Sequence, residues 1–282
     1  MYLFDSHSHV NFNDFKDDYK EVIRRALDKD IGMIIPGSQQ STSKRAVAIA
    51  NEYNSEKVYA AVGLHPIQLF EIFLSEEGKK FTSRAEEFDY DLYKILAQDK
   101  KVKAIGEVGL EYFHIKDLKI DQKEAQEKQK KALLLQIKLA KELNLPIILH
   151  CRDSDKNQND AYLDLLEILK KEKNVKGVLH CYGCFDEKIT KEFLKLGLYF
   201  SFNGVITFLK NEKFKELILG LPQERIFVET DCPYLTPEPY RGKRNEPIYV
   251  EFVAMKIAEF LGKNIEEVSA FTVKNSRTFF DL

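Results

Sequence analysis

The chain has few cysteines and no long apolar run. Its 282 residues include only four cysteines, at irregular spacings, which excludes the disulfide framework of small secreted proteins. No apolar stretch approaches the roughly 20 residues that cross a bilayer. The chain also does not begin with the basic and apolar segments of a secretion signal. We therefore expect a cytoplasmic protein that makes no contact with a membrane.

An excess of charge of one sign is also missing. The 43 basic and 45 acidic residues give a formal net charge of -2, so no chain-wide positive field attracts nucleic acid. A polyanion would have to be held by a local group of cations. Internal repeats and linkers rich in proline and glycine are absent too, and we expect residues 1–282 to form a single domain.

Short apolar segments alternate with longer segments of helical periodicity. Eight apolar segments predict strands, at residues 2–7, 31–36, 58–63, 102–109, 146–150, 175–180, 198–202 and 225–230. Strands separated by helices pair in parallel, and eight such units in about 250 residues suit an α/β protein with a (β/α)8 TIM barrel. Residues 264–280 predict an additional C-terminal helix. An open doubly wound sheet is the alternative, since alternation does not show closure.

Histidines and carboxylates lie where these predicted strands end. Five of the six histidines do so, together with two acidic residues: His7, His9, His65, His150, His180, Glu107 and Asp231. In a parallel barrel the loops that follow the strands form one face, which carries the catalytic groups. We therefore expect these side chains to meet at that face. His114 lies beyond its strand end, and we expect a loop or surface role for it.

The residue types at this face are those that bind divalent metal ions. Residues two apart in a strand point to the same side, so the pair His7 and His9 can face one ion. Taken alone, a His-x-His pair is equally typical of structural residues, and a single strand-end histidine is more often a hydrogen-bonded structural residue. Six ligands exceed one tetrahedral site, which favours two ions, Mg²⁺, Mn²⁺ or Zn²⁺. The predicted ligands are His7, His9 and Asp231 for one ion, His150 and His180 for the other, and Glu107 between them.

Cationic residues near the same strand ends suit the binding of phosphate. Three lie in the segment PYRGKRNEP and one lies two residues after His150; with His65 after the third predicted strand, the predicted phosphate-binding residues are His65, Arg152, Arg241, Lys243 and Arg244. An ordinary solvated basic loop is the alternative for the PYRGKRNEP segment. Glu229 shares the strand face of Asp231, and we expect it to orient a ligand histidine.

Cys181 and Cys184 form a CxxC pair beside His180, with no second pair nearby. A zinc knuckle or a redox pair is one interpretation of this spacing. Without a second pair, two buried thiols are the simpler interpretation, and we expect them.

The segments DSHSHVNF, GLHP, GEVGLEY, ILHCRDS, LHCYG and ETDCPYLTPEPYRGKRNEP, in this order, closely resemble the TatD-type deoxyribonuclease family over nearly the whole chain. The resemblance implies a metal-dependent TIM-barrel hydrolase, related to the amidohydrolases, in a family that includes enzymes acting on DNA. It also places all six predicted ligands on the metal-binding positions of the family. Glu111 stands where the family usually has aspartate, which leaves its role open.

These observations predict a metal-dependent deoxyribonuclease that removes nucleotides from a 3′ end. Two ions would activate water, with Asp231 accepting its proton and Glu107 between the ions. A few local cations suit single-stranded or frayed DNA ends, and no stable protein partner is predicted. The alternatives are a small-molecule amidohydrolase, lactonase or phosphoesterase, which often has a carboxylated lysine where Glu107 stands, and a non-catalytic interaction module, which the complete ligand set disfavours.

Overall fold

Eight parallel strands form the central sheet of the computed structural model, which describes residues 2–54, 57–76, 79–208 and 212–282. Each lies within or overlaps one of the eight predicted strands. In their order around the sheet they are β1 (Leu3–Asp5), β2 (Ile31–Pro36), β3 (Val58–Val62), β6 (Val102–Glu111), β7 (Ile147–Arg152), β8 (Gly177–Leu179), β9 (Tyr199–Phe202) and β10 (Ile226–Val228).

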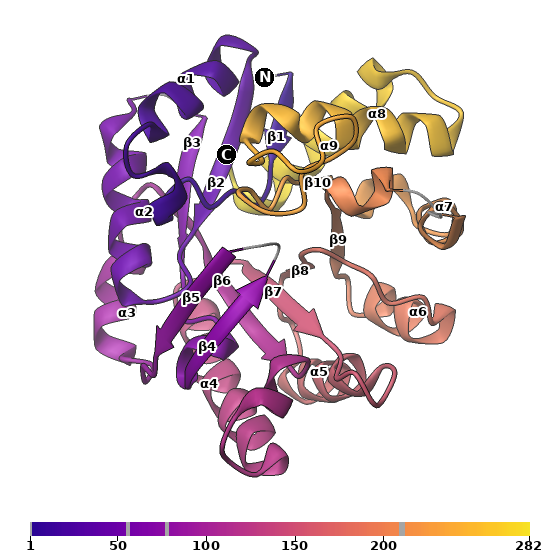
Figure 1. Cartoon of the computed structure of the whole chain (residues 1–282). Coiled ribbons are helices and arrows are strands. Elements are labelled where there is room, and N and C mark those ends of the chain that lie inside the picture. Colours follow the sequence, from indigo (N-terminus) through magenta and orange to yellow (C-terminus); the bar gives the residue numbers. More distant parts are fainter. Residues whose placement is uncertain (1, 55–56, 77–78, 209–211) are drawn as a thin grey trace.

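Helices follow the strands and surround the sheet (Figure 1). They are α1 (Tyr19–Asp28), α2 (Gln40–Glu52), α3 (Tyr90–Ala97), α4 (Gln122–Glu142), α5 (Asp160–Glu172), α6 (Glu187–Lys195), α7 (Glu212–Leu219), α8 (Val250–Leu261) and α9 (Ile265–Phe280). The longest, α4, begins where the Asp121 side chain accepts two backbone N–H groups, and it buries Leu133 and Ile137. None of the helices in these described ranges has the length and apolar character needed to cross a bilayer.

The barrel closes where the first and last strands end. The backbone N–H of Asp231 donates to the carbonyl of His7 at 2.9 Å, and that of His9 donates to the carbonyl of Cys232 at 2.9 Å. A parallel bridge joins Ser8 to Cys232 as well. These bonds carry the chain of β1 alongside that of β10, so the predicted TIM barrel is confirmed and the open sheet is excluded. They also involve the very residues predicted to bind metal.

Apolar side chains fill the barrel interior below the strand ends. Phe4, Ile148, Val178 and Phe227 belong to one buried cluster, and the last turn of α9 adds Phe279 and Phe280 to it. Figure 1 shows α9 beside β1 and β10. Because side chains alternate along a strand, residues two positions beyond these inward-facing ones also face inward. His150 and His180 therefore lie directly above the apolar interior.

An antiparallel hairpin that the sequence analysis did not predict follows β3. Its strands are β4 (Glu71–Glu76) and β5 (Lys79–Arg84), paired from Glu71 with Arg84 to Glu76 with Lys79. The hairpin is separate from the barrel sheet and is preceded by the 3-10 helix η2 (Pro66–Leu69). Its sequence is mostly polar and short, and such a segment has weak hydrophobic periodicity.

Candidate metal centre

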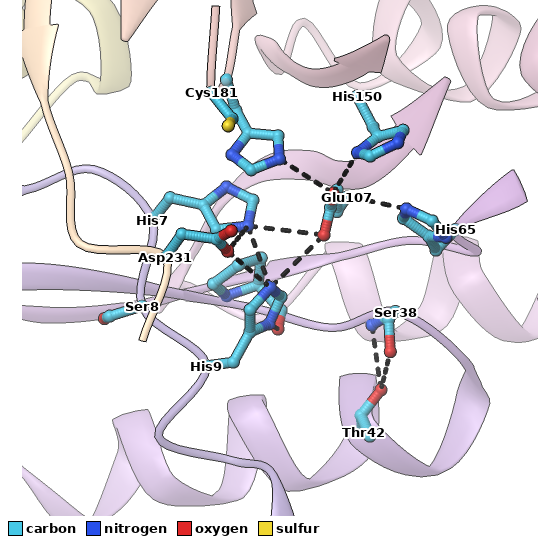
Figure 2. Close-up of polar contacts among 12 residues, drawn as sticks. His7, Ser8, His9, Ser38, Thr42, His65, Glu107, His150, Cys181 and Asp231 are labelled. Atoms are coloured by element: carbon cyan, nitrogen blue, oxygen red, sulfur yellow. Dashed lines mark hydrogen bonds and ion pairs between the residues drawn. The ribbon is translucent and has the colours of Figure 1, made fainter. Parts of the chain in front are cut away.

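Side chains from six barrel strands converge at the carboxyl end of the barrel (Figure 2). All six predicted ligands are among them: Glu107 and His150 lie within β6 and β7, while His7, His9, His180 and Asp231 lie just beyond the ends of β1, β8 and β10, and His65 follows β3. Their side chains are almost or largely buried, from 0% exposed for His7 to 16% for His150. The predicted meeting of these groups at one face is therefore what the structure shows.

Glu107 stands in the middle of the cluster, with its two oxygens facing different histidines. Its Oε2 atom lies 3.4 Å from His7 Nε2 and 3.3 Å from His9 Nε2. Its Oε1 atom lies 2.9 Å from His150 Nδ1 and 3.1 Å from His180 Nε2. A carboxylate that bridges two ions needs this division of its oxygens.

The first group consists of His7, His9, Asp231 and one oxygen of Glu107. The Nε2 atoms of His7 and His9 lie 3.0 Å apart, and Asp231 Oδ1 lies 3.7 and 3.6 Å from them. In a tetrahedral zinc site with bonds of about 2.0–2.1 Å, neighbouring ligand atoms lie about 3.3–3.4 Å apart. Because His9 Nδ1 donates to the Pro36 carbonyl, its Nε2 offers a lone pair. The spacing and chemistry of this group fit a divalent ion.

The second group consists of His150, His180 and the other oxygen of Glu107. His150 Nε2 donates to Glu111 Oε2 at 2.9 Å, and His180 Nδ1 donates to Glu229 Oε1 at 3.1 Å. Although burial opposes this shift, the nearby carboxylates raise the pKa of both rings, so without an ion each ring also holds a proton on the nitrogen that faces Glu107 Oε1. A divalent cation can take the place of these protons. The candidate ligand atoms that lie within 4.8 Å of one another here are those of Glu107, His150 and His65, so the structure supports a cation beside Glu107 and His150, and the place of His180 in this group stays a prediction.

His65 presents a hydrogen-bond donor to the cluster. Its Nδ1 accepts the backbone N–H of Ile67 at 3.2 Å, so the neutral ring carries its proton on Nε2. That nitrogen lies 3.5 Å from Glu107 Oε1. Burial lowers the pKa of His65 to about 3, which keeps the ring neutral. A nitrogen that carries a proton cannot bind a metal ion, so His65 is better suited to donate to a substrate.

Burial of many titratable groups together determines their charges. Burial and the neighbouring His180 lower the pKa of His7 to about 4. Burial raises the pKa of Asp231 to about 7, despite the nearby His180 and His9. Burial also acts to raise the pKa of Glu107, but the histidines around it, among them His180, hold that pKa well below its usual range. The centre of the cluster is therefore an ionised carboxylate with histidine nitrogens around it.

The backbone conformations of Gly109 and Asp231 position the ends of their strands at the cluster. Gly109 has a φ of +147°, and a Cβ atom there would overlap the carbonyl oxygen of His150. Glycine therefore allows β6 to approach β7 at the level of the cluster. Asp231 has a φ of +56°, in the left-handed region that aspartate tolerates better than most residues. Its side chain is thereby turned toward His7 and His9.

The predicted phosphate-binding residues lie in different surroundings. Arg152 is 41% exposed, and its guanidinium carbon lies 4.1 Å from the centre of the Phe113 ring. Arg241 and Lys243 are exposed in the loop after β10, with the Arg241 guanidinium carbon 3.6 Å from the Phe208 ring centre.

Arg244 is committed to contacts within the protein. Its guanidinium donates to the Asp14 carbonyl at 2.7 Å and to both carboxylate oxygens of Asp18, one of them at 2.9 Å. It also lies over the Phe15 ring. The structure therefore uses Arg244 to join the PYRGKRNEP segment to the start of α1.

Sequence reasoning left the role of Glu111 open and gave His114 a loop or surface role. Glu111 is four residues beyond Glu107 in β6, and this even spacing, which puts both on one strand face, was the signal that could have shown its position. His114 begins the 3-10 helix η3 (His114–Asp117) and is buried, with Nδ1 3.4 Å from Glu111 Oε1. All four cysteines are free, and Cys181 is the one that is not fully buried.

Known proteins resemble this chain over its whole length. It matches the TatD related DNase family over residues 4–281. It is 39% identical to a protein of Bacillus subtilis (strain 168) named uncharacterized metal-dependent hydrolase YabD, across 99% of this chain and 98% of that protein. It is 30% identical to the 3'-5' ssDNA/RNA exonuclease TatD of Klebsiella pneumoniae (strain 342), across 99% and 98%. The crystal structure of YJJV, a TatD homolog from Escherichia coli K12, superposes with a TM-score of 0.81 at 25% identity, across 99% and 98%. The chain is therefore a metal-dependent hydrolase that belongs to the TatD related DNase family.

Proposed function

We propose that this chain, as one hydrolase domain, is a two-metal exonuclease that removes nucleotides from the 3′ end of single-stranded DNA. The observation that carries the proposal is the position of Glu107, whose oxygens each face a separate set of histidine nitrogens at 2.9–3.4 Å. A carboxylate between two ions is the arrangement expected for phosphodiester hydrolysis. The name of the Klebsiella relative, a 3'-5' ssDNA/RNA exonuclease, supports the choice of substrate.

The ligands in this proposal are the six predicted from the sequence. His7, His9 and Asp231 would hold one ion, His150 and His180 would hold the other, and Glu107 would contribute to both. When bound, the two ions increase the acidity of water and neutralise charge on phosphoryl oxygens. Glu111 and Glu229 would not bind the ions themselves. Each accepts the N–H of a ligand histidine and so fixes which ring nitrogen can bind an ion.

Asp231 orients the attacking water and accepts its proton. Its side chain is 15% exposed, whereas that of Glu107 is 6% exposed, so water reaches Asp231 more easily. As the water oxygen bonds to phosphorus, the bond from phosphorus to the 3′ oxygen of the preceding nucleotide breaks. That oxygen takes a proton from solvent, and a mononucleotide leaves. The Nε2–H group of His65 donates a hydrogen bond to a phosphoryl oxygen.

Arg152, Arg241 and Lys243 bind the phosphates next to the cleaved bond. Arg152 ends β7, whereas Arg241 and Lys243 lie in the loop after β10, three strands further along the sheet. Three cations suffice for a few phosphates of a strand end, which agrees with a net charge of -2 for the whole chain. Arg244 is left out of this set because its donors are already bound within the protein.

The test is a metal-supplemented activity screen of the chelator-stripped chain. We expect Mn²⁺, Mg²⁺ or Zn²⁺ to restore stepwise shortening of a 5′-labelled single strand, with blunt duplex cut more slowly. Hydrolysis of small amides, lactones or phosphomonoesters in preference to DNA would contradict the proposal, and so would nuclease activity that needs no metal.

A further inference from the structure

We propose that Phe113 and Arg152 form a stacking site for one unpaired nucleobase at the barrel mouth. This inference rests on the proposed nuclease function. It adds that the protein binds one base of the substrate at this site. The site lies immediately after β6 and at the end of β7, beside the second group of candidate metal ligands.

The two side chains already stack on each other. Phe113 is partly exposed, and the guanidinium carbon of Arg152 lies 4.1 Å from its ring centre. Lys116 Nζ lies 3.8 Å from the same centre, so two cations border one aromatic ring. An aromatic ring and a guanidinium plane are the two surfaces on which proteins stack the bases of single strands. Supported by the ring, Arg152 offers a flat face to a base and N–H groups to a phosphate.

Hydrogen bonds fix the stacking site relative to the candidate metal centre. The backbone N–H of Phe113 donates to Glu111 Oε1 at 2.8 Å. The other oxygen of Glu111 accepts from His150 Nε2 at 2.9 Å. The Glu111 carboxylate thus holds Phe113 on one side and a predicted ligand on the other. A base stacked on the Arg152 guanidinium, which covers the ring, would therefore belong to a nucleotide close to the cleaved bond.

Polar groups adjoin the ring on its outer side. Lys116, which contacts the ring, also lines a hollow of about 40 Å³ with Gln122 and Gln126. Amide side chains both donate and accept hydrogen bonds, as the edge of any base requires. A base in a duplex is covered by its neighbours and its partner, so only an unpaired base can reach such a site. The site would make the enzyme favour single strands.

The test uses single-stranded oligonucleotides that carry one 2-aminopurine, whose fluorescence falls when it stacks. The full chain is stripped of metal, so that binding is measured without cleavage. We expect quenching when 2-aminopurine occupies one particular position near the 3′ end. Phe113→Leu, which keeps an apolar side chain without the ring, should remove the quenching and weaken binding about tenfold. Phe113→Trp should retain both.

Two further variants separate stacking from other effects. Arg152→Lys keeps the charge but loses the flat guanidinium, and we expect it to lose the quenching too. Tyr53→Leu removes a partly exposed ring between α2 and β3, at the opposite end of the barrel, and should bind like the wild type. If the fluorescence of 2-aminopurine is still fully quenched when the oligonucleotide binds Phe113→Leu or Arg152→Lys, the proposal is overturned. If quenching depends on Phe113 but no metal restores cleavage, the stacking site stands and the nuclease function fails.

Discussion

The Nε2 atom of His150 lies 2.9 Å from Glu111 Oε2, and the opposite ring nitrogen, Nδ1, lies 2.9 Å from Glu107 Oε1. One histidine thus joins two carboxylates of the same strand. Although burial opposes this shift, both carboxylates raise the pKa of the ring, so without an ion His150 donates from both nitrogens. An ion would replace the Nδ1 proton, while Glu111 keeps the Nε2 proton in place. Glu111 is therefore well placed to orient a candidate ligand.

Glu111→Gln tests this positioning role. The amide can turn a donor toward His150 Nε2, which disturbs the choice of ring nitrogen, and we expect metal affinity to fall about 10–100-fold. The affinity is measured by competition with a chelating dye, a readout independent of catalysis. Glu187→Gln, at a side chain that is 79% exposed on α6, is the matched control. Equal metal affinity in the two variants would rule out the role of Glu111.

Gly109→Ala tests the close approach of β6 to β7. A Cβ at Gly109 would overlap the His150 carbonyl, whereas one at Gly197, which also has a positive φ, would meet nothing within 4 Å. We expect Gly197→Ala to lower the free energy of unfolding by about 1 kcal/mol, the cost of the backbone conformation alone. Gly109→Ala should lower the free energy of unfolding by at least about 2 kcal/mol, because the backbone at His150 must also move to make room for the Cβ atom. Urea unfolding measures both, and equal costs would contradict the overlap.

Arg241 and Arg244 are close in sequence but should behave differently. Arg241→Ala should weaken single-strand binding and lower the slope of log affinity against log salt by about one, as the loss of one phosphate contact does. Arg277→Ala, at an exposed position of α9, controls for the change in net charge. An unchanged salt slope in Arg241→Ala would remove Arg241 from the phosphate-binding residues.

Arg244→Ala should lower stability instead, by about 1 kcal/mol for a half-exposed ion pair. Its hydrogen bonds lower the pKa of Asp18, so the stabilisation is present above the usual aspartate pKa of about 3.9 and is lost as the pH falls below it. Thermal unfolding of the variant and the wild type at pH 7 and pH 3 measures this. A difference in stability that stays the same at both pH values would contradict the assignment.

The sequence predicted the eight strands and the meeting of six side chains because both follow from simple periodicities. Inward-facing residues lie two apart in a strand, so Ile148 predicts the direction of His150, and Val178 that of His180. Parallel strands then bring their carboxyl ends together. No knowledge of side-chain packing is needed for either step.

The remaining features depend on contacts between distant segments. Arg244 pairs with Asp18, 226 residues earlier, and nothing local distinguishes it from Arg241, three positions before it. The proton on His65 Nε2 follows from a bond to the Ile67 backbone that exists only once η2 forms. The different roles of two arginines and the position of a histidine proton thus depend on contacts that form only in the folded chain. Such contacts leave no periodic signal in the sequence.

The central claim is that Glu107 lies between two ions, and electron paramagnetic resonance of the Mn²⁺-loaded chain tests it most directly. Two ions that share a carboxylate, roughly 3.5–4 Å apart, couple magnetically. We predict two Mn²⁺ per chain with a coupled spectrum, and loss of that coupling together with strand cleavage in Glu107→Ala. One ion per chain, or two ions that show no coupling in the wild type, would contradict the account.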